Sequence, residues 1–408
     1  MKPEILFLAH RIPYPPDRGD KIRSWHVLKH LGQFATVHLA CFADDEKDAA
    51  HLPALREAMG SSLGEAYVTT ISPSKLLWLA KAYTQRLTIN EAAMSSAGLQ
   101  SFVARIIAER PITGLYAFSV QMARFVPVGF RCPFVMDFVD FDSAKYADYA
   151  RAGGFPGRLV YEREARKMLA LEKATAARAD VSLFVSEAEA ALFRAEAQLP
   201  RAEIRAMSNG IDLSFYDPDA GFAPLEAPPA PLIVFTGQMD YRPNVEAVCT
   251  FARDVMPVIR QTHDARFAIV GRRPDPSVQA LDGKEGVIVT GEVPDVRPWL
   301  AAASVVAAPL TIARGIQNKV LEAMAMARPV VASAGAFEGI DAIPGRDLLV
   351  AEDAGAQAEA IMALLAAPER AVAMGKAARQ RMVDLYSWNA RLAPLAAMLG
   401  VAAEKAAA

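Results

Sequence analysis

The chain has 408 residues, of which 53% are apolar and 22% charged, and its formal net charge is −2. This length favours two or three domains that each bury a core of their own, and the balanced charge argues against nucleic acid as a partner. The three cysteines are far apart and lack the paired spacing of zinc or redox sites, so we expect buried packing residues in a reducing compartment.

The sequence predicts a cytoplasmic protein, at most in peripheral contact with the inner membrane. Only five apolar residues follow the charged start of the chain, too few for the apolar region of a signal peptide. Charged residues interrupt every long apolar stretch, so no membrane-spanning helix is expected. The segment Arg158–Arg178 carries six basic residues interspersed with glutamates. Such a segment is typical of a solvated helix face, and a face toward anionic lipid or a polyprenyl phosphate is the alternative.

The first half of the chain alternates between predicted strands and helices. A short apolar strand at Ile5–Ala9 precedes a loop rich in Pro and Gly at Arg11–Asp20, and a helical pattern follows at Lys21–Leu31. Further strands are predicted at Val37–Phe42, Leu115–Phe118 and Pro133–Asp137. This alternation predicts a parallel sheet covered by helices on both faces.

The alternation restarts after a connector at Gly221–Pro231, which holds four prolines and is therefore expected to be extended. Beyond it a helix is predicted at Asn244–Gln261, and strands are predicted at Leu232–Thr236, Ala265–Val270, Val287–Thr290 and Val305–Ala308. The Ala-rich tail at Ala356–Ala408 has a helical pattern that breaks near Ser387.

The predicted fold class is therefore α/β, with two doubly wound, Rossmann-like domains in tandem. We expect an N-terminal domain at 1–220, a linker at 221–231, a C-terminal domain at 232–380, and a final helix at 381–408 that packs back on the body. Open sheets of this kind bind ligands at the carboxyl ends of their strands, so function is expected in the loops that follow the strands.

The segment Leu310–Ser333, LTIARGIQNKVLEAMAMARPVVAS, is the most informative part of the sequence. A Gly-containing loop opens a helix there, and a helix N-terminus offers unpaired N–H groups and a positive dipole end that suit a pyrophosphate. Lys319 lies in the first turn, where a cation is unfavourable unless an anion binds. Glu322 follows one turn later, either as a partner for ribose hydroxyls or as an exposed first-turn acid.

This segment resembles retaining glycosyltransferase family 4, whose members carry a stretch LEAMAxGxPVVA and adopt the GT-B fold. Other pieces agree in order and spacing across nearly the whole second domain: MSNGID at 207–212, FTG at 235–237, AIVG at 268–271, GEV at 291–293 and the pair Ser387-Trp388. The resemblance implies an enzyme that transfers a hexosyl group from a nucleotide-diphosphate sugar without a metal ion or a bound cofactor.

The first domain is similar to a narrower group, the sugar transferases that accompany exopolysaccharide and PEP-CTERM sorting systems. The similarity lies in RIPYPPDRGDKIRSWH at 11–26 and DFVDFDSAKY at 137–146. It implies that the Gly19 backbone approaches the donor phosphates and that Asp20, Lys21 and Arg23 lie near the sugar or the acceptor. From the residues alone, Gly19 equally fits a tight turn and the charged residues a solvated first helical turn.

Two departures from the family pattern concern the donor pocket. The family usually has two glutamates eight positions apart, and Arg314 stands where the first would be. The Arg that often follows the first glycine is Gln238, which leaves Arg242 nearby and Asn244 at the helix start. Arg242 and Lys319 are the predicted diphosphate clamp, although an exposed Arg beside Pro243 is the ordinary alternative.

The resemblance thus implies two sets of site residues. The predicted catalytic residues are Lys319 and Arg242 for the leaving group, with Asp20 and Asp137 on the acceptor side. The predicted donor-binding residues are Gly19, Gly237, Asn244, Gly271, Arg272, Glu292, Arg314, Gly315 and Glu322. The implied partners are the nucleotide-diphosphate sugar and a glycan or polyprenyl-linked acceptor.

Two clusters invite a metal interpretation. Asp137, Asp140 and Asp142 lie together at a strand end, where a metal ion, acceptor orientation and helix capping are the alternatives, and the resemblance favours the last two. His26 and His30 share a helix face, and packing is expected because no companion ligand is evident. No metal site is predicted.

A retaining transfer develops an oxocarbenium-like sugar and a departing diphosphate, so positioning and charge stabilisation are the main requirements. Closure of the domains across the linker is expected to exclude water. Two alternatives remain: a nucleotide-sugar epimerase or hydrolase of GT-B fold, and a catalytically weak nucleotide-sugar-binding subunit, which Arg314 suggests. A nicotinamide oxidoreductase is disfavoured because no GxGxxG follows a predicted strand.

Overall fold

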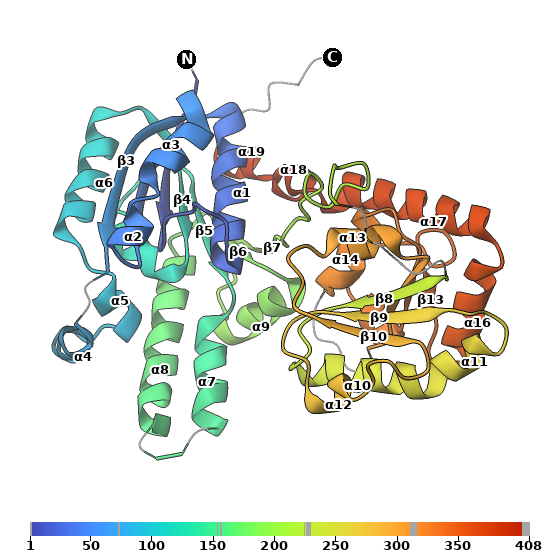
Figure 1. The fold of residues 1–408 in the computed structure, drawn as a ribbon. Helices are drawn as coiled ribbons and strands as arrows, with labels where there is room; N and C mark the ends of the chain where they lie inside the picture. Colours follow the sequence, from blue (N-terminus) through green and yellow to red (C-terminus); the bar gives the residue numbers. More distant parts are fainter. Residues whose placement is uncertain are drawn as a thin grey trace. The chain divides into compact units, whose positions relative to one another are not determined.

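A computed structural model describes residues 2–71, 74–152, 154–155, 157–223, 225, 230–310 and 316–401. The chain divides into two compact units (Figure 1). Unit 1 comprises Met1–Asn209 and Arg391–Ala408, and unit 2 comprises Gly210–Ala390. Each unit is an α/β domain built around one parallel sheet, as the alternating sequence pattern predicts.

The sheet of unit 1 has seven parallel strands in the order β3-β2-β1-β4-β5-β6-β7. Its register aligns the carboxyl ends of the central strands, because Ala9 pairs with Phe118 and Phe118 pairs with Asp137. The strands are β1 (Glu4–Ala9), β2 (Thr36–Ala43), β3 (Leu63–Thr70), β4 (Ile112–Phe118), β5 (Phe134–Val139), β6 (Val181–Phe184) and β7 (Ile204–Ala206).

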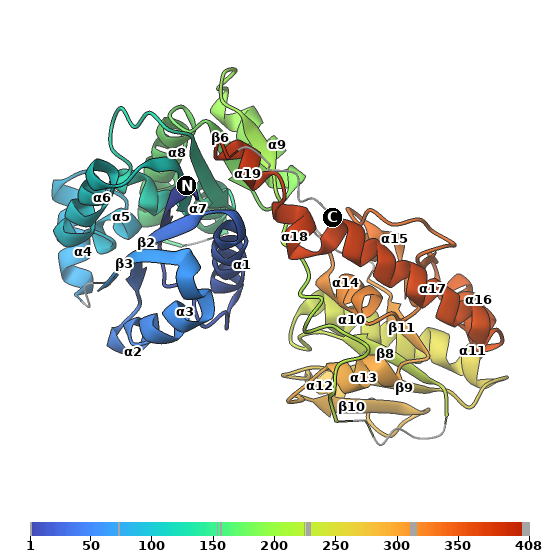
Figure 2. The same ribbon diagram turned by 90° about the horizontal axis from the view of Figure 1, so that it is seen from above.

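Helices cover both faces of this sheet, and Figure 2 shows α1 and α6 on either side of β2. The central strands are buried along almost their whole length, which explains their continuous apolar runs. The helices of unit 1 are α1 (Gly19–Phe34), α2 (Glu46–Ala49), α3 (Leu52–Met59), α4 (Lys75–Thr84), α5 (Ile89–Ala93), α6 (Ala97–Glu109), α7 (Asp142–Ala152), α8 (Gly157–Ala176) and α9 (Glu187–Ala197).

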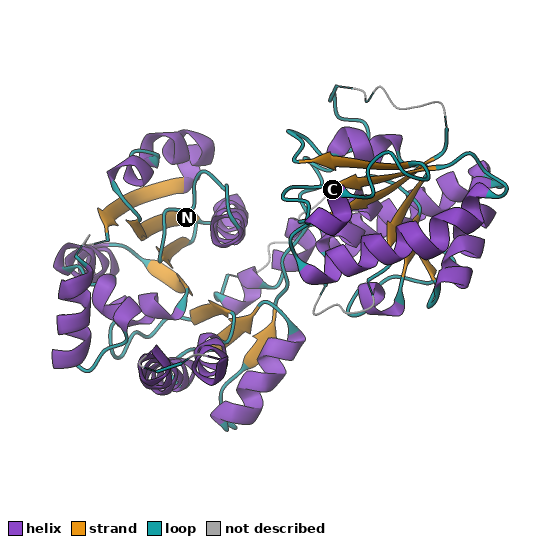
Figure 3. Ribbon diagram, turned by 60° about the horizontal axis from the view of Figure 1, so that its bottom comes forward, coloured by secondary structure: helices purple, strands orange, loops and turns teal. Residues whose placement is uncertain are grey.

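The sheet of unit 2 has six parallel strands in the order β10-β9-β8-β11-β12-β13, again between helices (Figure 3). Thr236 pairs with Val270, and Val270 pairs with Gly291, so three strand ends meet at one edge. The strands are β8 (Leu232–Thr236), β9 (Arg266–Val270), β10 (Val287–Gly291), β11 (Val305–Ala308), β12 (Val330–Ala332) and β13 (Leu349–Val350).

The predicted helix at Asn244–Gln261 is interrupted. It consists of α10 (Arg242–Thr250), a π-helical turn at Phe251–Val255 and α11 (Met256–Arg260). The other helices of unit 2 are α12 (Pro276–Gln279), α13 (Arg297–Ala302), α14 (Asn318–Ala325), α15 (Ala334–Phe337), α16 (Ala354–Leu365) and α17 (Pro368–Arg381).

The last described residues return to unit 1. The helical tail ends α17 in a π-helical turn at Met382–Tyr386, breaks at Ser387 as the sequence predicts, and continues as α18 (Trp388–Leu392) and α19 (Leu395–Met398). Within unit 1, α19 contacts α1, and Leu399 packs against Gly114 so closely that no side chain would fit there.

The division between the units differs from the predicted boundaries in two places. Residues 210–220 group with unit 2, where the predicted first domain included them, and unit 2 extends to Ala390. The reason is local: Ile211 forms an isolated β-bridge with Ser387, and its N–H donates to the Tyr386 carbonyl. Residues 224 and 226–229 of the predicted linker lie outside the described residues.

In the part of the chain that the structure describes, no helix is both long enough and apolar enough to cross a membrane.

Candidate functional site

Unit 2 has a cavity of about 510 Å³ at the carboxyl ends of β8, β9 and β10 and beside the start of α14. Seven of the predicted site residues line it: Gly237, Asn244, Gly271, Arg272, Glu292, Lys319 and Glu322. Its wall also contains residues that sequence reasoning missed, including Thr236, Tyr241, Gln317 and Asn318. The structure thus brings together residues that lie up to 86 positions apart in the chain.

Lys319 lies in the first turn of α14, which has no side-chain cap at its N-terminus and no acidic residue in its first turn. The Nζ atom donates to Oδ1 of Asn244 at 2.5 Å and lies 4.2 Å from the centre of the Phe235 ring. Burial lowers the pKa of Lys319 to about 8, and the nearby charge of Glu322 offsets part of this effect. A lysine at the positive end of a helix dipole, next to unpaired backbone N–H groups, favours the binding of an anion there.

Glu322 lies one turn later on α14, in the same cavity wall. Burial raises the pKa of its carboxyl group, while a hydrogen bond from the Tyr216 hydroxyl and the charge of Lys319 act in the opposite direction. Tyr216 precedes Glu322 by more than a hundred residues, so no sequence spacing pointed to it. Its hydrogen bond fixes one side of the carboxylate and leaves the group able to accept from ribose hydroxyls.

Two glycines let the backbone form the floor of this cavity. A Cβ atom at Gly271 would lie 1.6 Å from the Gly237 carbonyl oxygen, so no side chain fits there. A Cβ atom at Gly237 would lie 2.9 Å from Nδ2 of Asn244 and 3.3 Å from Nζ of Lys319. The loops are also joined by backbone bonds, from Gly237 N to Val270 O and from Gly271 N to Gly291 O. The glycines therefore keep the Lys319 ammonium group beside bare backbone.

The remaining polar groups of the wall have different partners. Arg272 is exposed and donates to Oε1 of Gln238 at 3.2 Å. The Thr236 hydroxyl is buried and has no hydrogen-bond partner among the described residues. A buried hydroxyl without a partner is costly, which is consistent with a site that a polar ligand completes.

Arg242, a predicted member of the diphosphate clamp, does not belong to this wall. Arg242 begins α10, its side chain is 87% exposed, and it pairs with Glu246 at 2.7 Å. It is not among the residues that line the cavity, although its neighbours Tyr241 and Asn244 are. Arg314 and Gly315 lie outside the described residues.

Unit 1 has a second cavity, of about 360 Å³, at the carboxyl ends of β1, β4 and β5. Asp20 is the only predicted catalytic residue among those lining it. The full lining is His10, Arg11, Arg18, Asp20, Phe118, Ser119, Phe138, Val139, Asp140 and Asp142. Ser119 and Val139 have φ values of 73° and 70°. A β-branched residue rarely adopts such a conformation, and backbone strain of this kind gathers at functional sites.

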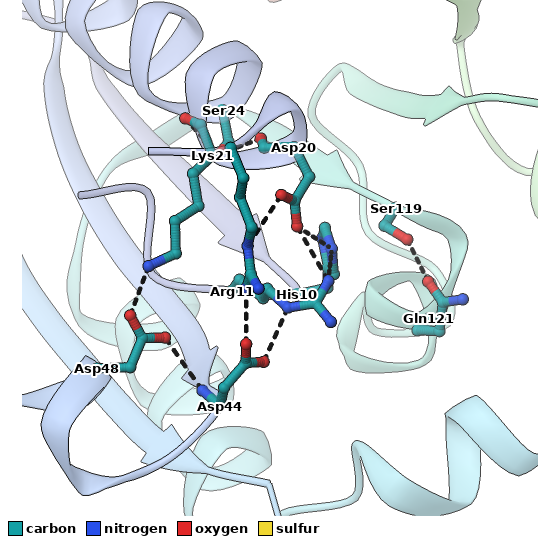
Figure 4. Close-up of polar contacts among 10 residues, drawn as sticks. His10, Arg11, Asp20, Lys21, Ser24, Asp44, Asp48, Ser119 and Gln121 are labelled. Carbon is teal, nitrogen blue, oxygen red and sulfur yellow. Dashed lines mark hydrogen bonds and ion pairs between the residues drawn. The ribbon is translucent and has the colours of Figure 1, made fainter. Parts of the chain in front are cut away.

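Asp20 is the centre of a polar network in this cavity (Figure 4). Its carboxylate lies 2.9 Å from Arg11, 3.2 Å from Arg18 and 3.3 Å from His10. Burial alone would raise the pKa of Asp20, but His10 and the two guanidinium groups outweigh it and hold the pKa well below its usual range. Burial lowers the pKa of His10. The network therefore presents an ionised aspartate beside a neutral imidazole.

Asp137 lies in a different environment from the one that the resemblance implies. It is fully buried at the end of β5 and does not line the cavity. Arg23 donates to both of its oxygens at 2.8 and 3.2 Å, and the Tyr116 hydroxyl donates at 2.5 Å. Arg23 also donates to Asn209 at 2.9 Å. Asp137 is therefore a buried structural residue. Through Arg23 it connects β5 with α1 and with Asn209.

The structure gives no sign of ligand contact at three other predicted residues of unit 1. Lys21 is buried and pairs with Asp48 at 2.5 Å. Gly19 is the first residue of α1, and a Cβ atom there would have nothing within 4 Å, so the fold of unit 1 does not require a glycine. Asp140 pairs with Lys145 at 2.5 Å. Within the described ranges, no group of three or more His, Cys, Asp or Glu residues is placed to hold a metal ion.

A larger cavity, of about 670 Å³, lies at the opposite edge of the sheet of unit 2. Pro231, Ser304 and Pro329, which precede β8, β11 and β12, are in its lining. Doubly wound sheets bind ligands at the carboxyl ends of their strands. We therefore place the candidate site in the smaller cavity, where the predicted residues converge.

One comparison with known proteins covers the segment that contains this cavity. Residues 230–367 match the family described as "Glycosyl transferases group 1". These residues include β8 to β12 and α14, and therefore the whole lining of the 510 Å³ cavity. No protein among the curated sequences matches the chain.

Solved structures match the chain over nearly its full length at low identity. Sucrose-phosphate synthase from Thermosynechococcus elongatus is 19% identical, with 97% of this chain and 98% of that chain covered and a TM-score of 0.60. HepE of Anabaena in complex with UDP is 16% identical, with 97% and 99% covered and a TM-score of 0.59. A glycosyltransferase from Rickettsia africae is 14% identical, with 99% and 100% covered and a TM-score of 0.61. Residues 230–367 therefore match the glycosyl transferases group 1 model, and the chain has the fold of the GT-B glycosyltransferases.

Proposed function

We propose that this protein is a retaining, family 4-like hexosyltransferase that moves a sugar from a nucleotide-diphosphate sugar to a glycan or polyprenyl-linked acceptor. One observation carries the proposal: Lys319 and Glu322 lie in the wall of one cavity, at the open start of α14 and beside the bare backbone of Gly237. An ammonium group and backbone N–H groups can bind the phosphates of a ribose diphosphate, and a carboxylate can accept hydrogen bonds from the ribose hydroxyls.

In this proposal the diphosphate binds between α14 and the loop after β8. Lys319 and the first N–H groups of α14 contact the phosphate oxygens, and Glu322 accepts from the ribose hydroxyls. Gly237 and Gly271 allow the diphosphate to approach the backbone. Asn244 holds Lys319 in place, and Arg272 and Glu292, in the same wall, complete the donor set. Arg314 and Gly315 stay predicted members of this set. Arg242 has no part in it, because its guanidinium lies outside the wall.

The reaction breaks the bond between the anomeric carbon and the diphosphate. Negative charge develops on the leaving phosphate oxygen, and Lys319 with the α14 dipole stabilises it there. Positively charged groups of the protein thereby take the place that a metal ion has in other sugar transferases, and we propose that no metal is required. The acceptor hydroxyl adds to the same face of the sugar, which retains the anomeric configuration.

We assign the acceptor side to the cavity of unit 1. Its ionised Asp20 can accept a hydrogen bond from a sugar hydroxyl, and neutral His10 can donate or accept one. Asp137 contributes to the acceptor site indirectly in this proposal. Its buried ion pair with Arg23 holds the strand end below the cavity in place, and its side chain does not contact the ligand. Lys21 and Arg23 belong to the supporting structure in the same sense, whereas Gly19 stays the predicted point at which the backbone approaches the donor phosphates.

The choice of donor to test first follows from the solved relatives. HepE of Anabaena was crystallised with UDP and with UDP-glucose. We propose a UDP-sugar as the donor, exopolysaccharide biosynthesis as the process, and the cytoplasm, at the inner membrane, as the place of reaction.

The experiment that tests the proposal is transfer from radiolabelled UDP-sugars to lipid-extracted and soluble glycan acceptors, with and without EDTA. We expect label to move to an acceptor from one donor, in EDTA, and the new linkage to keep the donor's anomeric configuration by NMR. Loss of activity in EDTA that Mg²⁺ restores would contradict the metal-independent mechanism. Release of free sugar alone, with no acceptor labelled in any extract, would favour a hydrolase instead.

A further inference from the structure

Exposed apolar side chains gather on one part of unit 1, formed by α4 and the hairpin of α7 and α8. Their residue exposures run from 38% for Tyr161 to 84% for Phe155. Soluble proteins rarely leave such a concentration of large apolar groups in water without a partner. We call this set the hairpin surface: Leu76, Leu77, Leu79, Tyr83, Tyr149, Phe155, Leu159, Val160 and Tyr161.

The two parts of the hairpin surface are joined by contacts within unit 1. Arg163 of α8 donates to the carbonyls of Ala82 and Leu87 at 2.8 and 3.0 Å, and its guanidinium lies 6.0 Å from the centre of the Tyr83 ring. The rings of Tyr149 and Tyr161 are 5.7 Å apart and connect α7 with α8. Figure 1 shows α7 and α8 side by side, projecting from the sheet of unit 1, with α4 beyond α5. The C-terminal end of α4 is therefore in contact with α8.

Helix α4 carries apolar residues at helical spacing on its exposed face. Leu76, Leu79 and Tyr83 follow the i, i+3, i+7 spacing of one helix face, and all three are at least half exposed. Ala82, about a quarter turn around the helix from this stripe, is buried. An outward-facing apolar stripe on a folded helix has no role in the core, so it points to something outside unit 1.

The charge around these apolar groups is positive. Residues 74–88 and 148–163 together carry six basic and two acidic side chains, a net charge of +4, in a chain whose net charge is −2. Lys75 and Arg86 are exposed without an acidic residue in their segment. Arg151 and Arg158 are exposed and make only surface pairs within their own helices. Exposed apolar groups together with exposed basic groups in the same segments complement a lipid bilayer, whose interior is apolar and whose headgroups carry negative charge.

We propose that the hairpin surface docks on an anionic lipid bilayer. The leucines, Phe155 and the tyrosines enter the headgroup region, and the basic side chains contact lipid phosphates. A second copy of the chain is a poorer occupant, because a symmetric pairing would place the same four exposed basic side chains against each other. The docking is independent of the sugar-transfer reaction.

Docking has a consequence for the acceptor, which rests on the proposed function. Asp142 begins α7 and also lines the cavity of unit 1. The 11 residues of α7 therefore lead from that cavity to the hairpin tip, over a distance of about 16 Å. A bilayer at the tip would keep the cavity within reach of a lipid-linked glycan. The acceptor class that fits best is thus a polyprenyl-linked sugar rather than a free one.

The test is co-sedimentation of the full chain with vesicles of phosphatidylcholine alone and of phosphatidylcholine with phosphatidylglycerol. We expect binding to the mixed vesicles, weak or no binding to the neutral ones, and release as salt concentration rises. Lys75→Gln combined with Arg158→Gln should weaken binding by about fivefold for each charge removed. Arg205→Gln, an exposed arginine of the same unit, is the matched control and should bind as the parent does.

The apolar part is tested with Leu76→Ser/Leu79→Ser and with Phe155→Ser, against Leu192→Ser in α9 as the control, which is 51% exposed. All of these side chains are exposed, so the variants should fold, and an unchanged urea unfolding transition would show it. We expect the first two variants to lose vesicle binding and the control to keep it. Vesicle binding and sugar transfer are measured separately, so failure of one proposal leaves the other standing.

Two outcomes would overturn the docking proposal. One is equal binding, or none, to neutral and anionic vesicles by the parent protein. The other is a concentration-dependent dimer, seen by light scattering, that Leu76→Ser/Leu79→Ser dissolves, because a second copy would then occupy the surface.

Discussion

The ammonium group of Lys319 lies 2.5 Å from the side-chain oxygen of Asn244, across the cavity floor formed by Gly237. Asn244 lies in the first turn of α10, the helix after β8, and Lys319 lies in the first turn of α14, the helix after β11, so the hydrogen bond joins the first turns of two helices at one sheet edge. It offsets part of the cost of burying a cation with no acidic partner in its own helical turn. The result is a cation directed at the position where a diphosphate would bind.

Lys319 and Glu322 should act on different parts of the nucleotide. Lys319→Ala should weaken UDP binding by roughly 10- to 100-fold, the loss of about 1.5–3 kcal/mol for a hydrogen bond to a charged group, and weaken uridine binding little. Glu322→Gln should weaken UDP and uridine by similar factors, because both carry the ribose. Isothermal titration with both ligands checks this. Equal losses for the two variants on both ligands would contradict the separate assignments.

Nucleotide affinity should fall as the pH rises. Burial holds the pKa of Lys319 at about 8, so the ammonium group is charged below this pH and neutral above it. The diphosphate is already ionised in this range, so UDP affinity should decrease between pH 7 and pH 9, approaching about tenfold per pH unit above the pKa. Lys319→Arg, which keeps its charge, should remove this dependence. An unchanged affinity in the parent protein across this range would show that Lys319 does not supply the charge.

Part of this site could be predicted from the sequence because its residues are adjacent in the chain or follow strands. Lys319 and Glu322 are three positions apart on one helix, and Gly237 and Gly271 directly follow apolar runs that can only be buried strands. Tyr216 could not be predicted, because its contact with Glu322 depends on how a segment without regular structure crosses unit 2. Arg242 could be placed near the site in sequence, but the direction of its side chain depends on where α10 begins.

The fold was predictable to a similar extent and for a related reason. Strands β8 and β11 have the predicted bounds, since buried parallel strands are continuous apolar runs bounded by polar loops. Strand β3 was not predicted, because it is half-buried and contains Gly64 and Glu65. Asp137 shows the limit at a single residue: its position at a strand end suggested a ligand contact, but its side chain points into the interior.

The two glycines of the cavity floor should respond differently to alanine. A Cβ atom at Gly271 would collide with the Gly237 carbonyl, a backbone atom that cannot move away, so Gly271→Ala should destabilise unit 2 by about 2–4 kcal/mol. At Gly237 the nearest atoms are the ends of flexible side chains. Gly237→Ala should therefore fold and bind UDP weakly, because Lys319 is displaced. Urea unfolding and titration distinguish the two effects; a stable Gly271→Ala would refute the packing argument.

The Arg23–Asp137 pair should matter for stability rather than for donor binding. Arg23→Met leaves a buried carboxylate without its charged partner, which costs about 3–5 kcal/mol, whereas Arg105→Met removes an exposed pair with Glu65 and should lower the free energy of unfolding far less. The measurement is urea unfolding of both variants. UDP affinity of the folded Arg23→Met protein should equal that of the parent. A specific loss of catalysis in a fully stable variant would instead make the pair part of the reacting site.

The most direct test of the central claim is thermal-shift screening of the protein with UDP, GDP, ADP and their sugars, in EDTA, alongside Lys319→Ala and Glu322→Ala. We predict that one nucleotide, UDP by the proposal above, stabilises the parent protein in EDTA and that both variants lose this stabilisation. If no nucleotide or nucleotide sugar stabilised the parent, the cavity at the start of α14 would not be a donor site, and the glycosyltransferase account would be contradicted.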